Sequence, residues 1–125
     1  MINKDLHVMR EIKKDELRVL IFPDRNSMAE AAAKDVSEKI HQLLKEKIII
    51  RMIFAAAPSQ LEFLGNLAKD QSIDWEKIDA FHMDEYIGLD ENDPQTFGNF
   101  LRRHIFDKVP FRNVYFINSN AADAT

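Results

Sequence analysis

Short apolar runs alternate along the chain with longer stretches in which apolar residues recur every three or four positions. Short runs bounded by turn residues are typical of buried strands, whereas the wider spacing forms one apolar stripe of a helix. The pattern predicts strands at 17–22, 48–54, 78–83 and 114–117. It predicts helices from Ser27 to about Lys47, from Leu61 to about Asp70 and from Gln95 to about Lys108.

Local signals mark where these elements begin and end. Ser27 and Glu30 have the spacing of a capping box, in which the hydroxyl and the carboxylate satisfy free backbone N–H groups at a helix start. Pro110 ends the last predicted helix. Residues 1–16 are charged and weakly patterned, and we interpret them as a separate amino-terminal helix or loop.

The order strand-helix-strand-helix-strand-helix-strand indicates an α/β fold with a mostly parallel sheet. Right-handed crossovers would place helices on both faces, giving a three-layer sandwich in which the run at 48–54 is a central strand. Ligands of such sheets bind beyond the carboxyl ends of the strands. We therefore expect functional residues in the loops at 23–27, 55–60 and 83–93.

Composition narrows the function classes. The chain has 125 residues, enough for one domain, with 17 Lys+Arg against 21 Asp+Glu and a net charge of −4. This acidic balance argues against nucleic-acid binding. No run approaches the roughly 18 apolar residues of a membrane span, and the polar start does not resemble a secretory signal, so we expect a cytoplasmic protein that does not bind membranes.

The cysteine and glycine counts exclude several kinds of site. Without cysteine there is no disulfide, thiolate metal site or cysteine nucleophile. The three glycines are Gly65, Gly88 and Gly98, so no glycine-rich phosphate loop can follow the first strands. Dinucleotide-binding fingerprints and Walker A loops both need several glycines in one short turn.

The densest candidate chemistry is the segment FHMDEYIGL at 81–89. A strand ending here brings Asp84 and Glu85 to the carboxyl edge of the sheet, where a carboxylate can act as a general base. Neighbouring residues on a strand point to opposite faces, so one carboxylate can face a cleft while the other anchors a loop or caps a helix. The alternative interpretation is that both are solvated loop acids.

This segment resembles FNMDEYVGL of the glucosamine-6-phosphate deaminase (isomerase) family. The similarity continues at DPQTF, residues 93–97, where the family has HPESY, and through NVYFIN at 113–118 to Asn120 and Ala121. It covers most of residues 17–125, which we interpret as the amino-terminal half of a deaminase-like domain.

The resemblance implies a Rossmann-like fold that needs no organic cofactor and no metal. It implies that Asp84 moves the C2 proton of an amino-sugar phosphate during aldose–ketose isomerisation, after which water displaces ammonia. Ser59, Glu85 and Tyr86 are the expected substrate-binding residues. His82 beside Asp84 offers only two metal ligands, too few for a site.

Two departures from the family qualify this expectation. The family's Thr-Gly-Gly-Thr-Pro phosphate loop is replaced by AAPSQ at 56–60, in which Pro58 has no N–H to donate and Ser59 keeps a hydroxyl for the helix end or an anion. The family is also about twice as long, so we expect this truncated chain to be inactive alone.

Two alternatives remain beside the deaminase interpretation. One is a hydrolase similar to 6-phosphogluconolactonase, and the other is a non-catalytic module that senses a sugar phosphate. A sheet cut short would leave an edge strand and an apolar face uncovered, so we expect a homo-oligomer.

Overall fold

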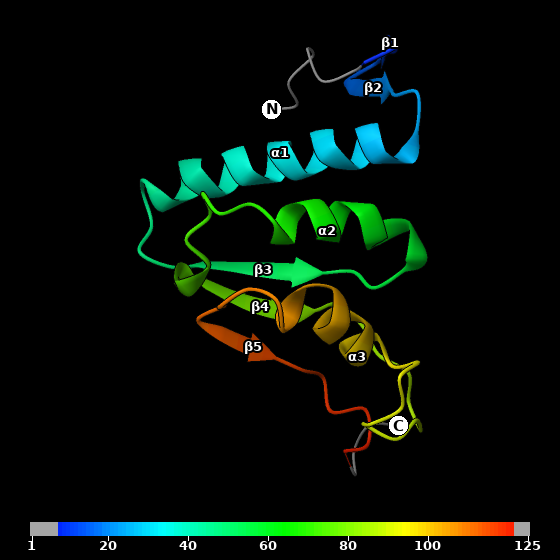
Figure 1. Cartoon of the computed structure of the whole chain (residues 1–125), viewed down its shortest axis with the longest axis vertical. Helices are drawn as coiled ribbons and strands as arrows, with labels where there is room; N and C mark the ends of the chain where they lie inside the picture. The colour runs from blue at the N-terminus through cyan, green and yellow to red at the C-terminus, as the bar shows by residue number, and fades with distance from the viewer. Residues whose placement is uncertain (1–7, 122–125) are drawn as a thin grey trace.

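The apolar runs in the second half of the chain pair as a parallel sheet. The computed structural model describes residues 8–121, and its sheet has the order β3-β4-β5 (Figure 1). The strands are β3 (Ile50–Phe54), β4 (Ile78–His82) and β5 (Asn113–Tyr115), and the register places Phe54 opposite His82. The predicted α/β class and parallel pairing are confirmed for this part of the chain.

The helices share one hydrophobic core against one face of this sheet. They are α1 (Arg25–Leu44), α2 (Leu61–Ala68) and the short α3 (Phe97–Leu101), which continues as a π-helical turn over Arg102–Phe106. The core side chains come from every one of these elements and from β3 and β4: Ala33, Ile40, Ile50, Phe54, Leu64, Leu67, Ile78, Ala80, Leu101, Ile105 and Phe106. No helix within residues 8–121 is long and apolar enough to cross a membrane.

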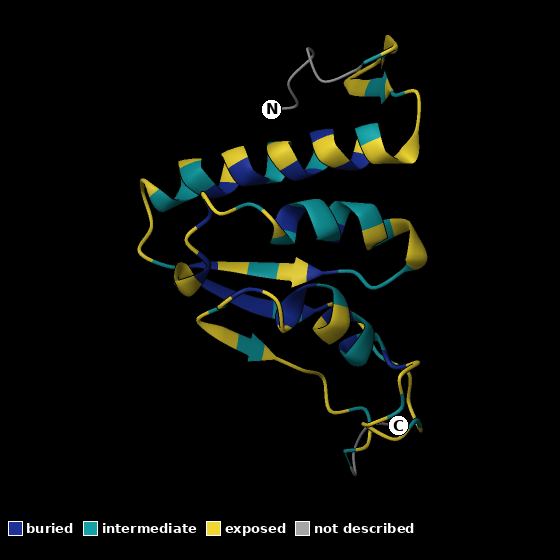
Figure 2. Ribbon diagram, in the orientation of Figure 1, coloured by how far each residue is buried: buried dark blue, intermediate teal, exposed yellow. Residues whose placement is uncertain are grey.

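The opposite face of the sheet is open. Ile53, Phe81 and Tyr115 form a cross-strand row on it, because the register aligns them and their neighbours point into the core. Ile53 is 67% exposed and Tyr115 is 49% exposed (Figure 2). The predicted helices on both faces are therefore wrong for the described residues, which form two layers. The prediction failed because alternation along the chain does not say on which face each helix packs.

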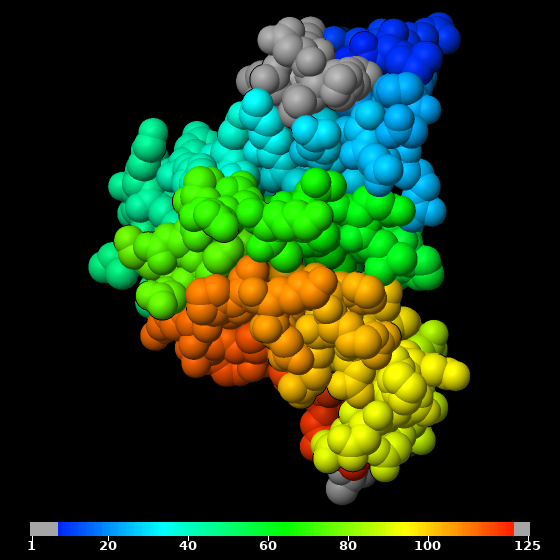
Figure 3. All heavy atoms as spheres, in the orientation of Figure 1, coloured from blue at the N-terminus to red at the C-terminus, as the bar shows by residue number. Residues whose placement is uncertain are grey.

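The run at 17–22 was predicted as a strand of the parallel sheet, and this is also wrong. It forms β2 (Leu17–Ile21), which pairs antiparallel with β1 (Arg10–Lys14) across a turn where Asp15 has a φ of 53°. This hairpin lies at one end of the molecule, with α1 and α2 between it and the parallel sheet (Figures 1 and 3).

The hairpin also corrects the interpretation of residues 1–16 as a helix or loop, of which residues 1–7 lie outside the described part. Residues 10–14 instead supply a charged partner strand that satisfies the backbone of β2 locally. As a result β3, predicted to be central, is an edge strand of the described sheet and β4 is its centre.

The cap of α1 also differs from the predicted capping box. Asp24 is the N-cap, and its Oδ1 accepts the Ser27 N–H at 2.7 Å. Ser27 therefore lies within the first turn of α1, where its backbone N–H donates to the Asp24 side chain. The helix ends at Leu44, three residues before the predicted end near Lys47. Both Asp24 and Ser27 are favourable cap residues, so sequence alone could not choose between them.

The assignment of the cap predicts different effects for two substitutions. Asp24→Ala should lower the free energy of unfolding by about 1 kcal/mol, because it removes the acceptor at the start of α1. Ser27→Ala should change it by less than about 0.5 kcal/mol, because the backbone N–H that Asp24 binds is still present. Urea unfolding followed by circular dichroism compares the two variants, and a larger loss for Ser27→Ala would contradict the assignment.

Candidate functional site

β4 delivers two adjacent carboxylates to the carboxyl edge of the sheet. The ladder extends one residue past His82, because the Met83 N–H donates to the Phe54 carbonyl at 3.0 Å. The next two residues, Asp84 and Glu85, differ in their exposure to solvent. Asp84 is exposed to solvent, whereas the side chain of Glu85 is only 6% exposed.

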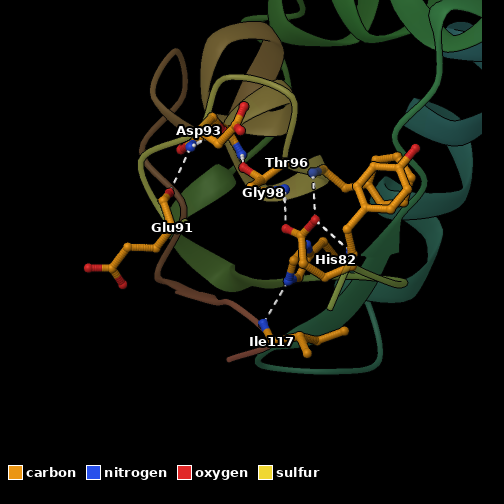
Figure 4. A network of polar contacts seen from close by, with 10 residues as sticks. His82, Glu91, Asp93, Thr96, Gly98 and Ile117 are labelled. Carbon is orange, nitrogen blue, oxygen red and sulfur yellow. Dashed lines mark hydrogen bonds and ion pairs between the residues drawn. The ribbon is translucent and has the colours of Figure 1, made fainter. Parts of the chain in front are cut away.

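Glu85 is the acid that anchors its surroundings. Its Oε1 accepts the backbone N–H groups of Tyr86 at 3.0 Å and Phe97 at 2.8 Å, and its Oε2 accepts that of Gly98 at 2.9 Å (Figure 4). Burial alone would raise the pKa of this carboxyl, but the three N–H donors and the nearby His82 outweigh it and lower the pKa. Glu85 is therefore ionised at neutral pH and joins the end of β4 to the start of α3.

His82 sits beneath this carboxylate with 1% of its side chain exposed. Its Nε2 accepts the Ile117 N–H at 2.6 Å, and its Nδ1 lies 3.9 Å from Glu85 Oε2 (Figure 4). Burial lowers the pKa of His82 and outweighs the opposite influence of Glu85 and Asp84, while Arg102 lowers it further. Because Nε2 accepts a hydrogen bond, we assign the neutral tautomer with hydrogen on Nδ1.

The acidic loop between Asp84 and α3 is held by side-chain amides. Asn99 Nδ2 donates to the carbonyls of Glu91 at 2.8 Å and Asp93 at 2.9 Å. Thr96 caps α3 by accepting the Asn99 N–H at 3.2 Å. The Asn120 amide reaches the Leu89 carbonyl at 2.9 Å, so the segment after β5 also fixes this loop.

The loop after β3 carries Ser59, the third predicted substrate-binding residue beside Glu85 and Tyr86. It lies in a 3-10 turn, Pro58–Gln60, whose N-cap is Ala57. Ser59 is exposed, and it does not cap α2, whose N-cap is Gln60. Its hydroxyl is accordingly at the surface beside the carboxyl end of β3.

Arg25 lies beside this loop, and the sequence analysis did not find it. Its Nη2 donates to the Pro58 carbonyl at 3.0 Å and to Glu62 Oε2 at 2.9 Å. The arginine is at the start of α1, more than thirty residues away in sequence. The loops at 23–27 and 55–60 therefore meet, although β2 is not in the parallel sheet.

The predicted residues fall into two groups, each of which follows one strand of the sheet. Asp84, Glu85 and Tyr86 follow β4, and the Tyr86 ring packs on Phe97 with centroids 4.5 Å apart. Ser59 follows β3, and an apolar hollow of about 230 Å³ between the two strand ends includes Met83 in its lining. Within residues 8–121 no three His, Asp or Glu side chains are grouped to hold a metal ion.

The ionised state of Glu85 predicts an acid-sensitive stability. Because the folded pKa lies below the unfolded value of about 4.3, the stabilisation is complete above that pH and is lost as the pH falls through the folded pKa. Glu85→Gln should therefore flatten the decline of unfolding free energy between about pH 5 and pH 3. Urea unfolding at several pH values measures this slope. Asp84→Asn is the control, and equal slopes for wild type and Glu85→Gln would contradict the assignment.

Substitutions at two glycines test how closely Gly98 in α3 packs against Phe116 and Glu85. A Cβ on Gly98 would lie 3.1 Å from the Phe116 ring and 3.3 Å from Glu85 Oε2, whereas a Cβ on Gly65 in α2 meets nothing within 4 Å. Gly98→Ala should cost about 1–3 kcal/mol of stability. Gly65→Ala should raise the free energy of unfolding by about 0.5–1 kcal/mol, because alanine has a higher helix propensity than glycine. Thermal unfolding of both variants checks this, and a stabilised Gly98→Ala protein would refute it.

The chain resembles curated proteins over most of its length. No protein-family model matches it. A glucosamine-6-phosphate deaminase of Porphyromonas gingivalis is 29% identical over 115 residues, which is 87% of this chain and 44% of that protein. One from Borrelia hermsii is 30% identical over 115 residues, again 87% of this chain and 43% of the relative.

Solved structures show the same fold. A monomeric glucosamine-6-phosphate deaminase described as a missing link of the NagB superfamily superposes with a TM-score of 0.67 at 19% identity, covering 81% of this chain and 42% of that one. A 6-phosphogluconolactonase from Plasmodium vivax gives a TM-score of 0.73 at 15% identity, with 90% and 40% coverage.

The chain thus spans less than half the length of the relatives that it matches. Sequence similarity extends over most of the chain, and the fold agrees with it, so the resemblance first seen at residues 81–89 is confirmed. The chain is related in sequence and fold to glucosamine-6-phosphate deaminases, and it covers about 42% of a full-length relative.

Proposed function

We propose that this chain is part of an enzyme that isomerises an amino-sugar phosphate and releases ammonia, with Asp84 as the base. The observation that carries the proposal is the position of Asp84. It is exposed to solvent just after the carboxyl end of β4, in the same segment as the buried His82 and the anchored Glu85. The curated relatives named glucosamine-6-phosphate deaminases support the substrate class.

In the proposed reaction the Asp84 carboxylate removes the C2 proton of the open-chain aldose. The electron pair moves toward the carbonyl oxygen, and an enediol-like species forms. Return of a proton to C1 leaves a protonated imine at C2. Water then adds at C2, ammonia leaves, and the ketose is formed. A proton next to a carbonyl is weakly acidic, so this step requires a positioned base. Glu85 supports it by fixing the backbone on both sides of the acidic loop.

The phosphate end of the substrate would lie at the loop after β3. Ser59 offers an exposed hydroxyl there, and Arg25 places a cation beside the Pro58 carbonyl at 3.0 Å. Arg25 also binds the Glu62 carboxylate at 2.9 Å, so a phosphate at this loop would share the guanidinium with Glu62. Tyr86, half exposed and packed on Phe97, would border the sugar.

The rest of the active site would come from parts of the protein beyond the matched region. Since the chain covers less than half of its relatives, we expect it to be inactive alone. We also expect the open face with Ile53, Phe81 and Tyr115 to be covered in the complete protein, giving the three-layer, Rossmann-like sandwich. A cytoplasmic homo-oligomer remains our expectation for the whole molecule.

A lactonase is the second candidate, and the superpositions on 6-phosphogluconolactonases favour it. Such an enzyme would open a phosphorylated sugar lactone by hydrolysis, without moving a C2 proton. The products distinguish the two activities, because the lactonase releases an acid and the deaminase releases ammonia.

The role of Asp84 predicts a large effect of one substitution in the complete protein. Asp84→Asn should lower ammonia release from glucosamine 6-phosphate by about 10²–10⁴-fold, the usual contribution of a general base. The fold should persist, because Asp84 is exposed. Asp107→Asn, an exposed acid after the π-helical turn, is the matched control and should keep wild-type turnover.

Coupled assays for ammonia from glucosamine 6-phosphate and for acid from 6-phosphogluconolactone measure both candidate activities in these variants. Undiminished ammonia release by Asp84→Asn would exclude Asp84 as the base. Acid release from the lactone, with no ammonia from the amino sugar, would establish the hydrolase instead.

A further inference from the structure

His82 is a buried titratable side chain to which the proposed reaction gives no role. It ends β4 opposite Phe54 of β3, and 1% of its side chain is exposed. The family segment FNMDEYVGL, which residues 81–89 resemble, has asparagine where this chain has His82. Here, therefore, an imidazole that titrates near neutral pH stands in place of an amide.

We propose that His82 is a proton-sensitive positioning residue for the acidic loop that begins at Asp84. In its neutral form it holds residues 116–121, the segment after β5, against the end of β4, and this segment in turn holds the loop. When His82 takes up a proton it loses this hold, and the loop loosens. The structural coupling stands by itself, and only its effect on catalysis rests on the function proposed for Asp84.

The hydrogen bond between His82 and Ile117 requires a neutral imidazole. His82 Nε2 accepts the Ile117 N–H at 2.6 Å (Figure 4). An imidazolium carries hydrogen on both ring nitrogens and has no acceptor left. Protonation would place two N–H donors face to face, so a charged His82 is compatible with this fold only after Ile117 moves away.

Residues 116–121 transmit the effect to the acidic loop. Within residues 8–121, two hydrogen bonds tie this segment to other elements: the one from Ile117 to His82, and the one from Asn120 Nδ2 to the Leu89 carbonyl at 2.9 Å. The bond at Ile117 lies along the chain between the end of β5 and Asn120. Its loss therefore frees the stretch of chain that positions the Asn120 amide.

The acidic loop has a second support at its far end. Asn99 Nδ2 donates to the carbonyls of Glu91 and Asp93, and these bonds do not involve residues 116–121. The part of the loop that loses its support is consequently the part around Leu89, which is nearer to Asp84 in sequence. A proton on His82 thus acts on the half of the loop that contains the proposed base.

The charged groups around His82 determine where it titrates. Glu85 and Asp84 follow it in the chain, and Glu85 Oε2 lies 3.9 Å from His82 Nδ1. Arg102 approaches from the π-helical turn, with its guanidinium carbon 3.9 Å from the centre of the Phe116 ring, which packs edge-on against the imidazole. Burial lowers the pKa of His82 more than the two carboxylates raise it, and Arg102 lowers it further.

The direction of the pH effect follows from this environment. Because the folded pKa of His82 lies below the unfolded value of about 6.5, the fold favours the neutral form. The resulting stabilisation is complete above that pH and is lost as the pH falls through the folded pKa. Mild acidification should therefore loosen residues 116–121 before the protein as a whole unfolds.

A second histidine provides a matched control. His41 Nε2 bonds to the Ser72 carbonyl at 2.9 Å, and because a carbonyl can only accept, this imidazole is the donor and keeps its bond when it is protonated. His82→Gln replaces the ring with an amide that can accept the Ile117 N–H but does not titrate. His41→Gln removes the other imidazole by the same substitution and should leave the coupling intact.

The experiment is an NMR titration of the isotope-labelled chain from about pH 8 to pH 4, which follows the His82 ring nitrogens, the Ile117 amide and the Asn120 side-chain amide. In the wild type, Nε2 should be the nitrogen without hydrogen at high pH. Both amides should then shift with the midpoint of His82, and Ile117 hydrogen exchange, corrected for its intrinsic pH dependence, should become about tenfold faster. His41→Gln should behave like wild type, whereas His82→Gln should lose this response.

Three results would each overturn the proposal. The first is an Nε2 that carries hydrogen at high pH, and the second is an Ile117 amide that does not follow the His82 midpoint. The third is an unchanged pH response of Ile117 in His82→Gln. The first two need no substitution, so they decide the question even if His82→Gln does not fold. None of the three measures enzymatic activity, so failure here is distinct from failure of the role proposed for Asp84.

Discussion

The buried carboxylate of Glu85 holds three parts of the chain together. By accepting the N–H groups of Tyr86, Phe97 and Gly98, it joins the end of β4, the acidic loop and the first turn of α3. A helix as short as α3 has little stability of its own, so its position depends on such contacts. The carboxylate also lets a loop rich in acids keep one conformation, because the negative charge nearest the core is neutralised by backbone dipoles.

Burial and hydrogen bonding together set the protonation states of Glu85 and His82. The backbone N–H donors keep Glu85 ionised, while burial keeps His82 neutral so that Nε2 can accept the Ile117 N–H. Protonating His82 on Nε2 would remove that acceptor and release the segment after β5. Glu85 is thus committed to backbone contacts, whereas Asp84 beside it is exposed to solvent.

The sequence predicted those parts of the fold that depend on local pattern. The apolar run before Asp84 and the helical stripe of Leu64 and Leu67 lie where expected. The partner of a strand and the face on which a helix packs are long-range properties, which explains the missed hairpin and the wrongly predicted helices on the open face of the sheet. The same reason applies to Arg25, whose partners Pro58 and Glu62 are distant in sequence. Strand alternation did anticipate that one acid of the pair would anchor a loop, and the fold identifies it as Glu85.

The most direct test of this account is a carboxyl-carbon NMR titration of Glu85, recorded together with the amide protons of Phe97 and Gly98. The account predicts a midpoint below that of an ordinary glutamate, with both amide resonances moving at the same pH as the carboxylate protonates. A midpoint at or above the ordinary value, with amides that do not respond, would show that Glu85 does not hold α3 to the sheet.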